Sequence, residues 1–215
     1  MTLTTPTLYV GSKRYSSWSL RPYLALAHTG QPFETKVIIL DQPETRAQIL
    51  AVNPTGRVPV LHHDGLVIWD SLAICEYVHE LYPAAKLWPD DRAQRARARS
   101  ISAEMHSSFA AMRSAMGMDL HGHYPGKGHT PEALADVRRI QTIWREQLAQ
   151  SGGPFLFGAF TIADAMFAPV TTRFTTYGVD MDATLRAYVD AVQALPAFVA
   201  WKADGKHEPV LPDHL

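Results

Sequence analysis

The chain changes character near residue 82, and this change restricts the folds that it can adopt. Before that position, short runs of β-forming residues alternate with segments of helical apolar spacing. After it, no convincing strand pattern appears again. The sequence therefore predicts a small α/β domain over residues 1–82, a linker over 83–91 and an all-helical domain over 92–215.

The first domain is expected to contain a β–α–β unit, then a hairpin and a helix. Its segments are 7–10, 21–30, 34–39, 57–69 and 71–82. Asp64 and Gly65 mark the hairpin, because this dipeptide accepts the positive φ of a two-residue turn. In the second domain, helices are expected at roughly 92–116, 131–150, 161–176, 182–194 and 196–204.

Composition favours a globular protein whose partners are small molecules or proteins. Of the 215 residues, 47% are hydrophobic and 19% are charged, which is enough to bury a substantial core. A net charge of -1 without long runs of like charge leaves no electrostatic footprint for nucleic acid or anionic membrane. The sequence shows no signal-peptide pattern and no apolar run near the roughly 20 residues that span a bilayer. We therefore expect a soluble, cytoplasmic protein.

Cysteine and histidine usage gives no sign of a disulfide or a metal site. Cys75 is the only cysteine, which excludes an internal disulfide and a zinc site built from paired cysteines. Its helical spacing with apolar neighbours indicates a buried thiol. His121, His123 and His129 lie in a glycine-containing loop without the spacing of a ligand set, so no metal is expected.

The stretch "YSSWSLRP" joins a predicted strand to a predicted helix. Pro22 fits only the first turn of a helix, so the helix is expected to begin near Ser19, with Ser19 as its N-cap. Ser16 and Ser17 would then lie in the preceding turn, beside unpaired N–H groups that favour an anion such as a thiolate. Alternatively, all three serines serve only in capping and turn formation.

Two further signals follow the serine turn. Val58 and Pro59 open a β-run; an X-Pro bond is cis in only about 5–6% of cases, so the dipeptide alone favours trans. Asp70 and Ser71 stand at the start of a helix, where they are expected to act as a cap. The same pair has another use, because a carboxylate holds an ammonium while a hydroxyl and helix N–H groups hold a carboxylate.

In this order and separation, the three signals resemble the N-terminal domain of the glutathione transferase family. The resemblance covers essentially the whole chain and implies a thioredoxin-like α/β domain followed by an all-α domain. It extends to "FGAFTIADAMFAP", which is similar to the family's second-domain capping segment, with Thr161 as the cap and Asp164 three residues later. Ser17, four residues before Arg21, is similar to the serine-type branches, with a distant likeness to the zeta type.

The resemblance also implies roles in binding glutathione as co-substrate. Ser17 would donate a hydrogen bond to the glutathione sulfur, with Ser16 as the close alternative. The main chain of Val58, before a cis Pro59, would pair with the cysteinyl part of the tripeptide. The remaining contacts would come from Asp70 and Ser71 at the γ-glutamyl end and from Gln42 or Arg57 at the glycyl side.

The electrophile site is expected on the first long helix of the second domain. Met105, Phe109, Met112 and Met116 form an apolar stripe there, which is typical of a core or a subunit interface. Candidate substrate-binding residues on and near this stripe are His106, Phe109, Met112, Arg113 and Tyr177.

Three functional classes follow from the resemblance. The leading one is a detoxifying transferase that adds the glutathione thiolate to small hydrophobic electrophiles. A glutathione-dependent isomerase or dehalogenase would use the same thiolate, although zeta-type isomerases carry a cysteine where this chain has Trp18. The third is a non-catalytic relative that binds glutathione or a protein. The resemblance also implies a two-fold homodimer, formed through the helix at 71–82 and the segment 95–112.

Overall fold

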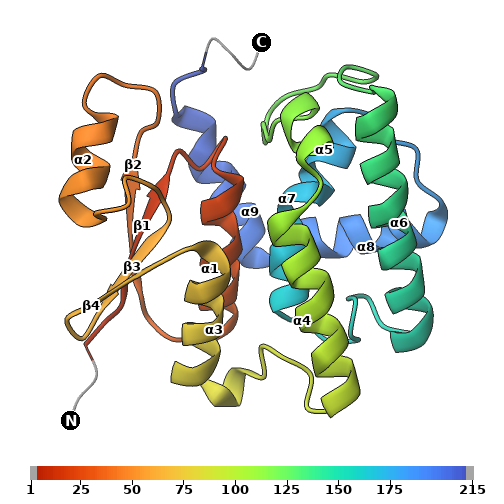
Figure 1. Ribbon diagram of the computed structural model, residues 1–215, viewed down its shortest axis with the longest axis horizontal. Coiled ribbons are helices and arrows are strands. Elements are labelled where there is room, and N and C mark those ends of the chain that lie inside the picture. Colours follow the sequence, from red (N-terminus) through yellow and green to blue (C-terminus); the bar gives the residue numbers. More distant parts are fainter. Residues whose placement is uncertain (1–3, 212–215) are drawn as a thin grey trace.

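A computed structural model describes residues 4–211 and shows a sheet-containing half beside a helical half (Figure 1). The first half contains β1 (Thr7–Gly11), α1 (Ser17–His28), β2 (Glu34–Ile38), α2 (Thr45–Val52), β3 (Val60–His63), β4 (Leu66–Trp69) and α3 (Ser71–Leu81). The second half contains α4 (Arg92–Ser107), α5 (Ala110–Ala115), α6 (Pro131–Ser151), α7 (Ile162–Thr176), α8 (Ala183–Gln193) and α9 (Pro196–Asp204). Short 3-10 turns lie at η1 (Pro83–Ala85) and η2 (Gly205–His207). The outermost residues of both predicted domains, 1–3 and 212–215, lie outside the described residues.

The four strands form a mixed sheet in the order β2-β1-β3-β4. Strands β1 and β2 are parallel and joined through α1, whereas β3 is antiparallel to both β1 and β4. The predicted hairpin is confirmed: Asp64 and Gly65 have φ values of 47° and 78° between β3 and β4. This topology is the α/β arrangement that the sequence predicts.

Helix α1 joins the two halves of the molecule. It packs against α3 within the first half and against α7 of the second. In Figure 1, α1 and α3 stand between the sheet and the helical half. Helix α7 begins with the predicted capping box, in which the Thr161 N–H donates to Asp164 at 2.8 Å. Because most of α7 is buried, its start and its packing against α1 fix how the two halves meet.

The expected start of the first helix is wrong by two residues. Helix α1 begins at Ser17, and Ser16 is its N-cap residue, without a side-chain capping bond. Ser19 lies inside the first turn, where its hydroxyl accepts from the Gly11 N–H at 3.1 Å and from the Ser16 hydroxyl at 2.8 Å. Ser19 therefore ties the helix to β1, a contact that local capping preference does not predict.

The expected helix 92–116 is two helices. The break falls at Phe109, whose φ of 62° lies in the left-handed region. Side chains replace the hydrogen bonds that the break removes: Asp136 accepts from the Met112 N–H at 3.0 Å, and Arg113 donates to the His106 carbonyl at 3.2 Å. These two side chains therefore stabilise the break at Phe109. The apolar spacing of 92–116 does not predict it, because the spacing continues through the break.

Helix α2 was not predicted from the sequence. It buries only Ile49, so its apolar face is too narrow to give a helical pattern. The other expected helices agree with the structure to within one or two residues at each end.

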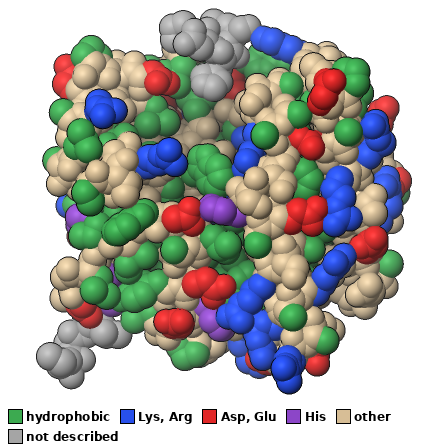
Figure 2. Space-filling view, viewed as in Figure 1, with side chains coloured by type: hydrophobic (Ala, Val, Ile, Leu, Met, Phe, Trp, Pro, Cys, Tyr) green, Lys and Arg blue, Asp and Glu red, His purple; other side chains and the backbone are tan. Residues whose placement is uncertain are grey.

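Lys and Arg side chains gather over the helical half of the face in Figure 2. In the helical half, Arg139 pairs with Glu104 and Arg145 pairs with Asp182, both at 2.7 Å. Such exposed pairs contribute little to stability. Among residues 4–211, no helix combines the length and the apolar character that crossing a bilayer requires.

Candidate active site

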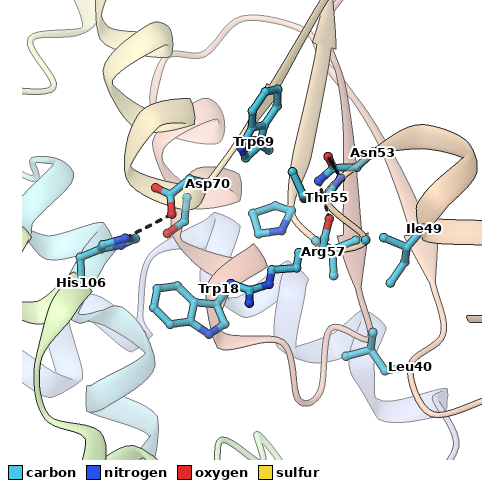
Figure 3. A pocket seen from close by; sticks show the side chains of 13 residues that line it. Trp18, Leu40, Ile49, Asn53, Thr55, Arg57, Trp69, Asp70 and His106 are labelled. Atoms are coloured by element: carbon cyan, nitrogen blue, oxygen red, sulfur yellow. Dashed lines mark hydrogen bonds and ion pairs between the residues drawn. The ribbon is translucent and has the colours of Figure 1, made fainter. Parts of the chain in front are cut away.

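A cleft of about 800 Å³ lies between the two halves (Figure 3). Its walls are Trp18, Leu40, Ile49, Asn53, Thr55, Gly56, Arg57, Val58, Pro59, Trp69, Asp70, Ser71 and His106. All of these except His106 come from the first half, and His106 reaches in from α4. The structure therefore brings together six of the predicted site residues: Arg57, Val58, Pro59, Asp70, Ser71 and His106.

The Val58–Pro59 peptide bond is cis, as the family resemblance predicts. The loop before it is held by Asn53, whose amide donates to the Arg57 carbonyl at 2.7 Å and accepts from the Thr55 N–H at 3.1 Å. Asn53 is fully buried. Because a buried amide with such bonds fixes its neighbours, Asn53 positions the main chain that lines this side of the cleft.

Asp70 connects the two halves across the cleft. One carboxylate oxygen accepts from the N–H groups of Leu72 and Ala73, at 2.9 and 3.3 Å, and so caps α3. The other lies 3.1 Å from the Nε2 atom of His106, as Figure 3 shows. Asp70 has a φ of 75° and a ψ of 131°, a sparsely populated conformation of the kind that clusters at functional sites. Asp70 therefore caps α3, as predicted, and it also contacts His106, which was not predicted.

Ser71 follows Asp70 as the first residue of α3. Its side chain is 1% exposed, and its hydroxyl oxygen has no hydrogen-bond partner among the described residues. Buried hydroxyl groups are normally paired. Since Ser71 also lines the cleft, a bound ligand is a suitable partner.

The serine turn approaches the cleft through Trp18. Ser16 and Ser17 are each 7% exposed and are not among the lining residues, whereas Trp18, the second residue of α1, is. The Ser16 hydroxyl donates to Ser19. The Ser17 hydroxyl has no hydrogen bond to any residue between 4 and 211. The backbone N–H of Trp18 has none either. Two donors at the N-terminus of α1 are therefore open to a ligand.

The remaining predicted site residues are not among those that line the cleft. Gln42 is exposed, and its amide contacts the Leu40 carbonyl of its own loop. Phe109, Met112 and Tyr177 are buried and do not line the cleft. Arg113 is half-buried, with its guanidinium 5.1 Å from the ring centre of Trp18. Burial lowers the pKa of Arg113.

Cys75 and the loop histidines form no site of their own. Cys75 is fully buried, as predicted, and burial raises the pKa of its thiol well above the usual value. Burial lowers the pKa of His121, whose ring contacts the Lys202 carbonyl at 2.9 Å. Across the part of the chain that the structure describes, no three His, Cys, Asp or Glu side chains come together to hold a metal.

Sequence reasoning missed several lining residues, among them Trp18, Leu40, Asn53 and Trp69. Trp18 is part of the serine motif, at the position where zeta-type isomerases carry a cysteine. Asn53 directly precedes Pro54, and an Asn-Pro pair is typical of a turn, which is the sequence signal for its position. Leu40 carries no local signal, because its place in the cleft depends on how the loop after β2 folds back.

Two family models match the chain. Residues 15–81 match the glutathione S-transferase N-terminal domain, and residues 127–201 match the C-terminal domain of the same family. The chain belongs to the glutathione S-transferase family. Glutathione S-transferases with solved structures share its fold: a glutathione transferase homolog from Burkholderia gl BGR1, solved with bound glutathione, has a TM-score of 0.73 and 26% identity. That match covers 94% of this chain and 98% of the other.

Curated relatives of this glutathione S-transferase include isomerases. A maleylacetoacetate isomerase from Pseudomonas aeruginosa is 31% identical, over 89% of this chain and 92% of its own length. A probable maleylacetoacetate isomerase from Caenorhabditis elegans is 29% identical, over 94% of each chain. The chain therefore spans nearly the full length of both relatives.

Proposed function

We propose that the protein is a glutathione-dependent transferase that binds glutathione in the cleft between its two halves. One observation carries the proposal: the N-termini of α1 and α3 and the cis Val58–Pro59 segment meet at the same cleft. Helix N-termini favour anions, and glutathione carries two carboxylates and an ionisable thiol. A main chain that faces the cleft can pair with its peptide groups.

The residues around the cleft fit the parts of glutathione. Ser71, at the N-terminus of α3, has a hydroxyl without a partner in the described part of the chain, which suits the γ-glutamyl carboxylate. Asp70 supplies the negative charge for the neighbouring ammonium. Arg57 is exposed, lines the cleft and suits the glycyl carboxylate, with Gln42 as a second candidate on the adjacent loop.

Activation of the thiol is assigned to Ser17. A free thiol has a pKa of about 8.5, so lowering it by about two units requires roughly 2.7 kcal/mol of preferential stabilisation of the thiolate. The Ser17 hydroxyl and the Trp18 N–H have no other partner among the described residues, whereas the Ser16 hydroxyl is engaged with Ser19. Two donors near a helix N-terminus can supply a stabilisation of this size. Glutathione then provides the nucleophile for attack on an electrophile beside Trp18, Trp69 and His106, which line the cleft.

A second candidate is a glutathione-dependent isomerase. It is favoured by the two full-length relatives named maleylacetoacetate isomerase. Both candidates need the same bound thiolate, and both suit the cytoplasm, where thiols stay reduced.

The test combines calorimetric titration with glutathione and a panel of electrophiles. We expect saturable glutathione binding and glutathione-dependent consumption of chloronitrobenzenes, with isomerisation of a maleyl compound measured in parallel. Consumption of the maleyl compound alone would select the isomerase. Binding without turnover of any compound would indicate a non-catalytic relative, and absence of binding would contradict the proposal.

We further propose that the protein is a two-fold homodimer, formed through α3 and the segment 95–112 as the resemblance implies, with β4, which packs against α3, beside them. Strand β4 is an edge strand with three exposed apolar residues. The exposed fractions of Leu66, Val67 and Trp69 are 51%, 39% and 49%. Exposed apolar side chains on a sheet edge favour association. Light scattering at micromolar concentration should give twice the mass of the 23.9 kDa chain. A mass equal to one chain would reject the dimer.

A further inference from the structure

The last described segment of the chain crosses the loop that leads into α1. We call residues 205–211 the C-terminal strap and residues 12–16 the pre-helix loop. The strap begins with η2, directly after α9. The pre-helix loop ends at Ser16, the N-cap residue of α1, and is followed at once by Ser17. The strap therefore contacts the segment that sets the position of the serine assigned to the glutathione thiolate.

Glu208 of the strap holds the main chain of the pre-helix loop with both of its carboxylate oxygens. One oxygen accepts from the Lys13 N–H at 2.8 Å, and the other accepts from the Arg14 N–H at 2.9 Å. Glu208 is half-buried, and bonds from backbone N–H groups to a carboxylate are stronger than bonds between neutral groups. Because the two N–H groups are successive in the chain, Glu208 fixes the orientation of two neighbouring peptide groups.

The carbonyl groups of the same two residues are also held by distant partners. The indole of Trp201 donates to the Lys13 carbonyl at 2.8 Å, and the Leu120 N–H donates to the Arg14 carbonyl at 3.3 Å. All four main-chain polar groups of Lys13 and Arg14 are thus bonded to residues far along the sequence. The pre-helix loop therefore takes its conformation from the strap and the helical half.

The strap fits closely against the pre-helix loop at both of its ends. At the first end, a Cβ atom on Gly205 would lie only 2.9 Å from the Arg14 backbone nitrogen, so only glycine permits this approach. At the other end, Leu211 is buried, and its N–H donates to the Tyr15 hydroxyl at 3.2 Å. Glu208 lies between these two contacts and is the residue of the strap that bonds the loop through a charged group.

Bonds within the pre-helix loop connect Lys13 and Arg14 to the start of α1. The Ser12 carbonyl accepts from the N–H groups of Tyr15 and Ser16, at 3.1 and 2.8 Å. Lys13 and Arg14 lie between the donors and the acceptor of this turn. A change in their peptide orientation therefore changes the turn, and with it the position of the N-cap residue that precedes Ser17.

We propose that Glu208 is a positioning residue for thiol activation, because it holds the pre-helix loop so that the Ser17 hydroxyl and the Trp18 N–H face the glutathione sulfur. The proposal rests on the proposed transferase function. Glu208 is not among the residues that line the cleft, and the groups assigned to the carboxylates and the ammonium of glutathione belong to other segments. Its loss is therefore expected to act on the thiol and to leave most of the glutathione affinity intact.

The charge of Glu208 and its positioning role act on the thiol pKa in opposite directions. A negative charge near a thiolate disfavours the charged form, so removal of the charge alone lowers the thiol pKa or leaves it unchanged. Loss of positioning withdraws hydrogen-bond donors from the thiolate and raises the thiol pKa. The sign of the shift in Glu208→Gln therefore separates the two effects.

Asp204 provides a matched control at the same loop. Its carboxylate pairs with the side-chain ammonium of Lys13, and its side chain is 59% exposed. Within residues 4–211, it forms no hydrogen bond with the main chain of the pre-helix loop. Asp204→Asn thus removes one negative charge beside the loop and keeps the bonds that hold its peptide groups.

The first experiment measures the hold on the loop in the whole protein without glutathione. Hydrogen exchange of the Lys13 and Arg14 N–H groups is followed by NMR in the wild type, Glu208→Gln and Asp204→Asn. Glutamine keeps one acceptor oxygen but turns an NH2 group toward the second N–H. We expect at least one of the two N–H groups to exchange about tenfold faster or more in Glu208→Gln, and neither to change in Asp204→Asn. Unchanged exchange in Glu208→Gln would overturn the proposal.

The second experiment measures the thiolate absorbance of the glutathione complex against pH, together with turnover of a chloronitrobenzene. We expect Glu208→Gln to raise the thiol pKa by about half a unit to one unit and to lower kcat at neutral pH about three- to tenfold. KM for glutathione should change less than about twofold. Glu208→Asp keeps both oxygens on a shorter side chain and should show a smaller rise in the thiol pKa. Asp204→Asn should show none.

Each outcome of the second experiment decides the role of Glu208. A lowered or unchanged thiol pKa in folded Glu208→Gln would overturn it, and so would an equal rise in Asp204→Asn or a change confined to KM. If thermal unfolding shows that Glu208→Gln does not fold, Glu208→Asp decides: a raised thiol pKa supports the role, and an unchanged one rejects it. If the wild type forms no glutathione thiolate, the transferase proposal fails and the role fails with it. If the wild type forms the thiolate and Glu208→Gln forms it equally well, only the role of Glu208 fails.

Discussion

Replacing Ser17 by alanine is expected to raise the thiol pKa of bound glutathione by about one to two units and to slow turnover at neutral pH about ten- to hundredfold. The Ser17 hydroxyl is the donor assigned to the thiolate, and its loss withdraws about 1.4–2.7 kcal/mol from the charged form. Because the hydroxyl has no bond to the rest of the described chain, the fold and most of the glutathione affinity should remain. Raising the pH should restore part of the rate.

Thiolate absorbance of the glutathione complex, followed against pH, measures the effect directly. Ser16→Ala is the matched control, since it removes a hydroxyl that is already bonded to Ser19 at 2.8 Å. A raised pKa in Ser16→Ala alone would transfer the role to Ser16. Unchanged titrations in both variants would assign activation to the Trp18 N–H and the dipole of α1.

Replacing Asp70 by alanine is expected to weaken glutathione binding about ten- to hundredfold, while the thiol pKa hardly moves. A hydrogen bond to a charged group contributes about 1.5–3 kcal/mol, and the γ-glutamyl ammonium would lose such a partner. The measurement is calorimetric titration with glutathione. The result separates binding from activation, because the same variant should keep most of its turnover at saturating glutathione.

Asp70→Asn provides the control for the structural contacts of Asp70. Asparagine keeps an oxygen that can accept from the N–H groups of Leu72 and Ala73, but it removes the charge. We expect Asp70→Asn to weaken binding nearly as much as Asp70→Ala. Normal affinity in Asp70→Asn combined with weak affinity in Asp70→Ala would mean that Asp70 acts through its cap on α3. Unchanged affinity in both would exclude Asp70 from glutathione recognition.

Local sequence determined several features of both domains. Asp64 and Gly65 set the hairpin because few other residue pairs accept two successive positive φ values. Thr161 and Asp164 set the start of α7, since both members of a capping box lie within one turn. The family motifs, read in order, also led to the cis Val58–Pro59 bond, although the dipeptide alone favours trans.

Only the tertiary structure decided the features that depend on partners distant in sequence. Phe109 interrupts the expected long helix because Asp136 and Arg113 satisfy the exposed backbone groups. The Ser19 hydroxyl bonds Gly11 of β1 and the Ser16 hydroxyl. Of the three serines in the turn, Ser17 therefore keeps its hydroxyl available for a ligand. The contact of Asp70 with His106 combines elements from both halves. Helical periodicity and capping depend on residues only a few positions apart. Which buried charges and hydroxyls have hydrogen-bond partners depends instead on how α1, α4 and α7 pack together.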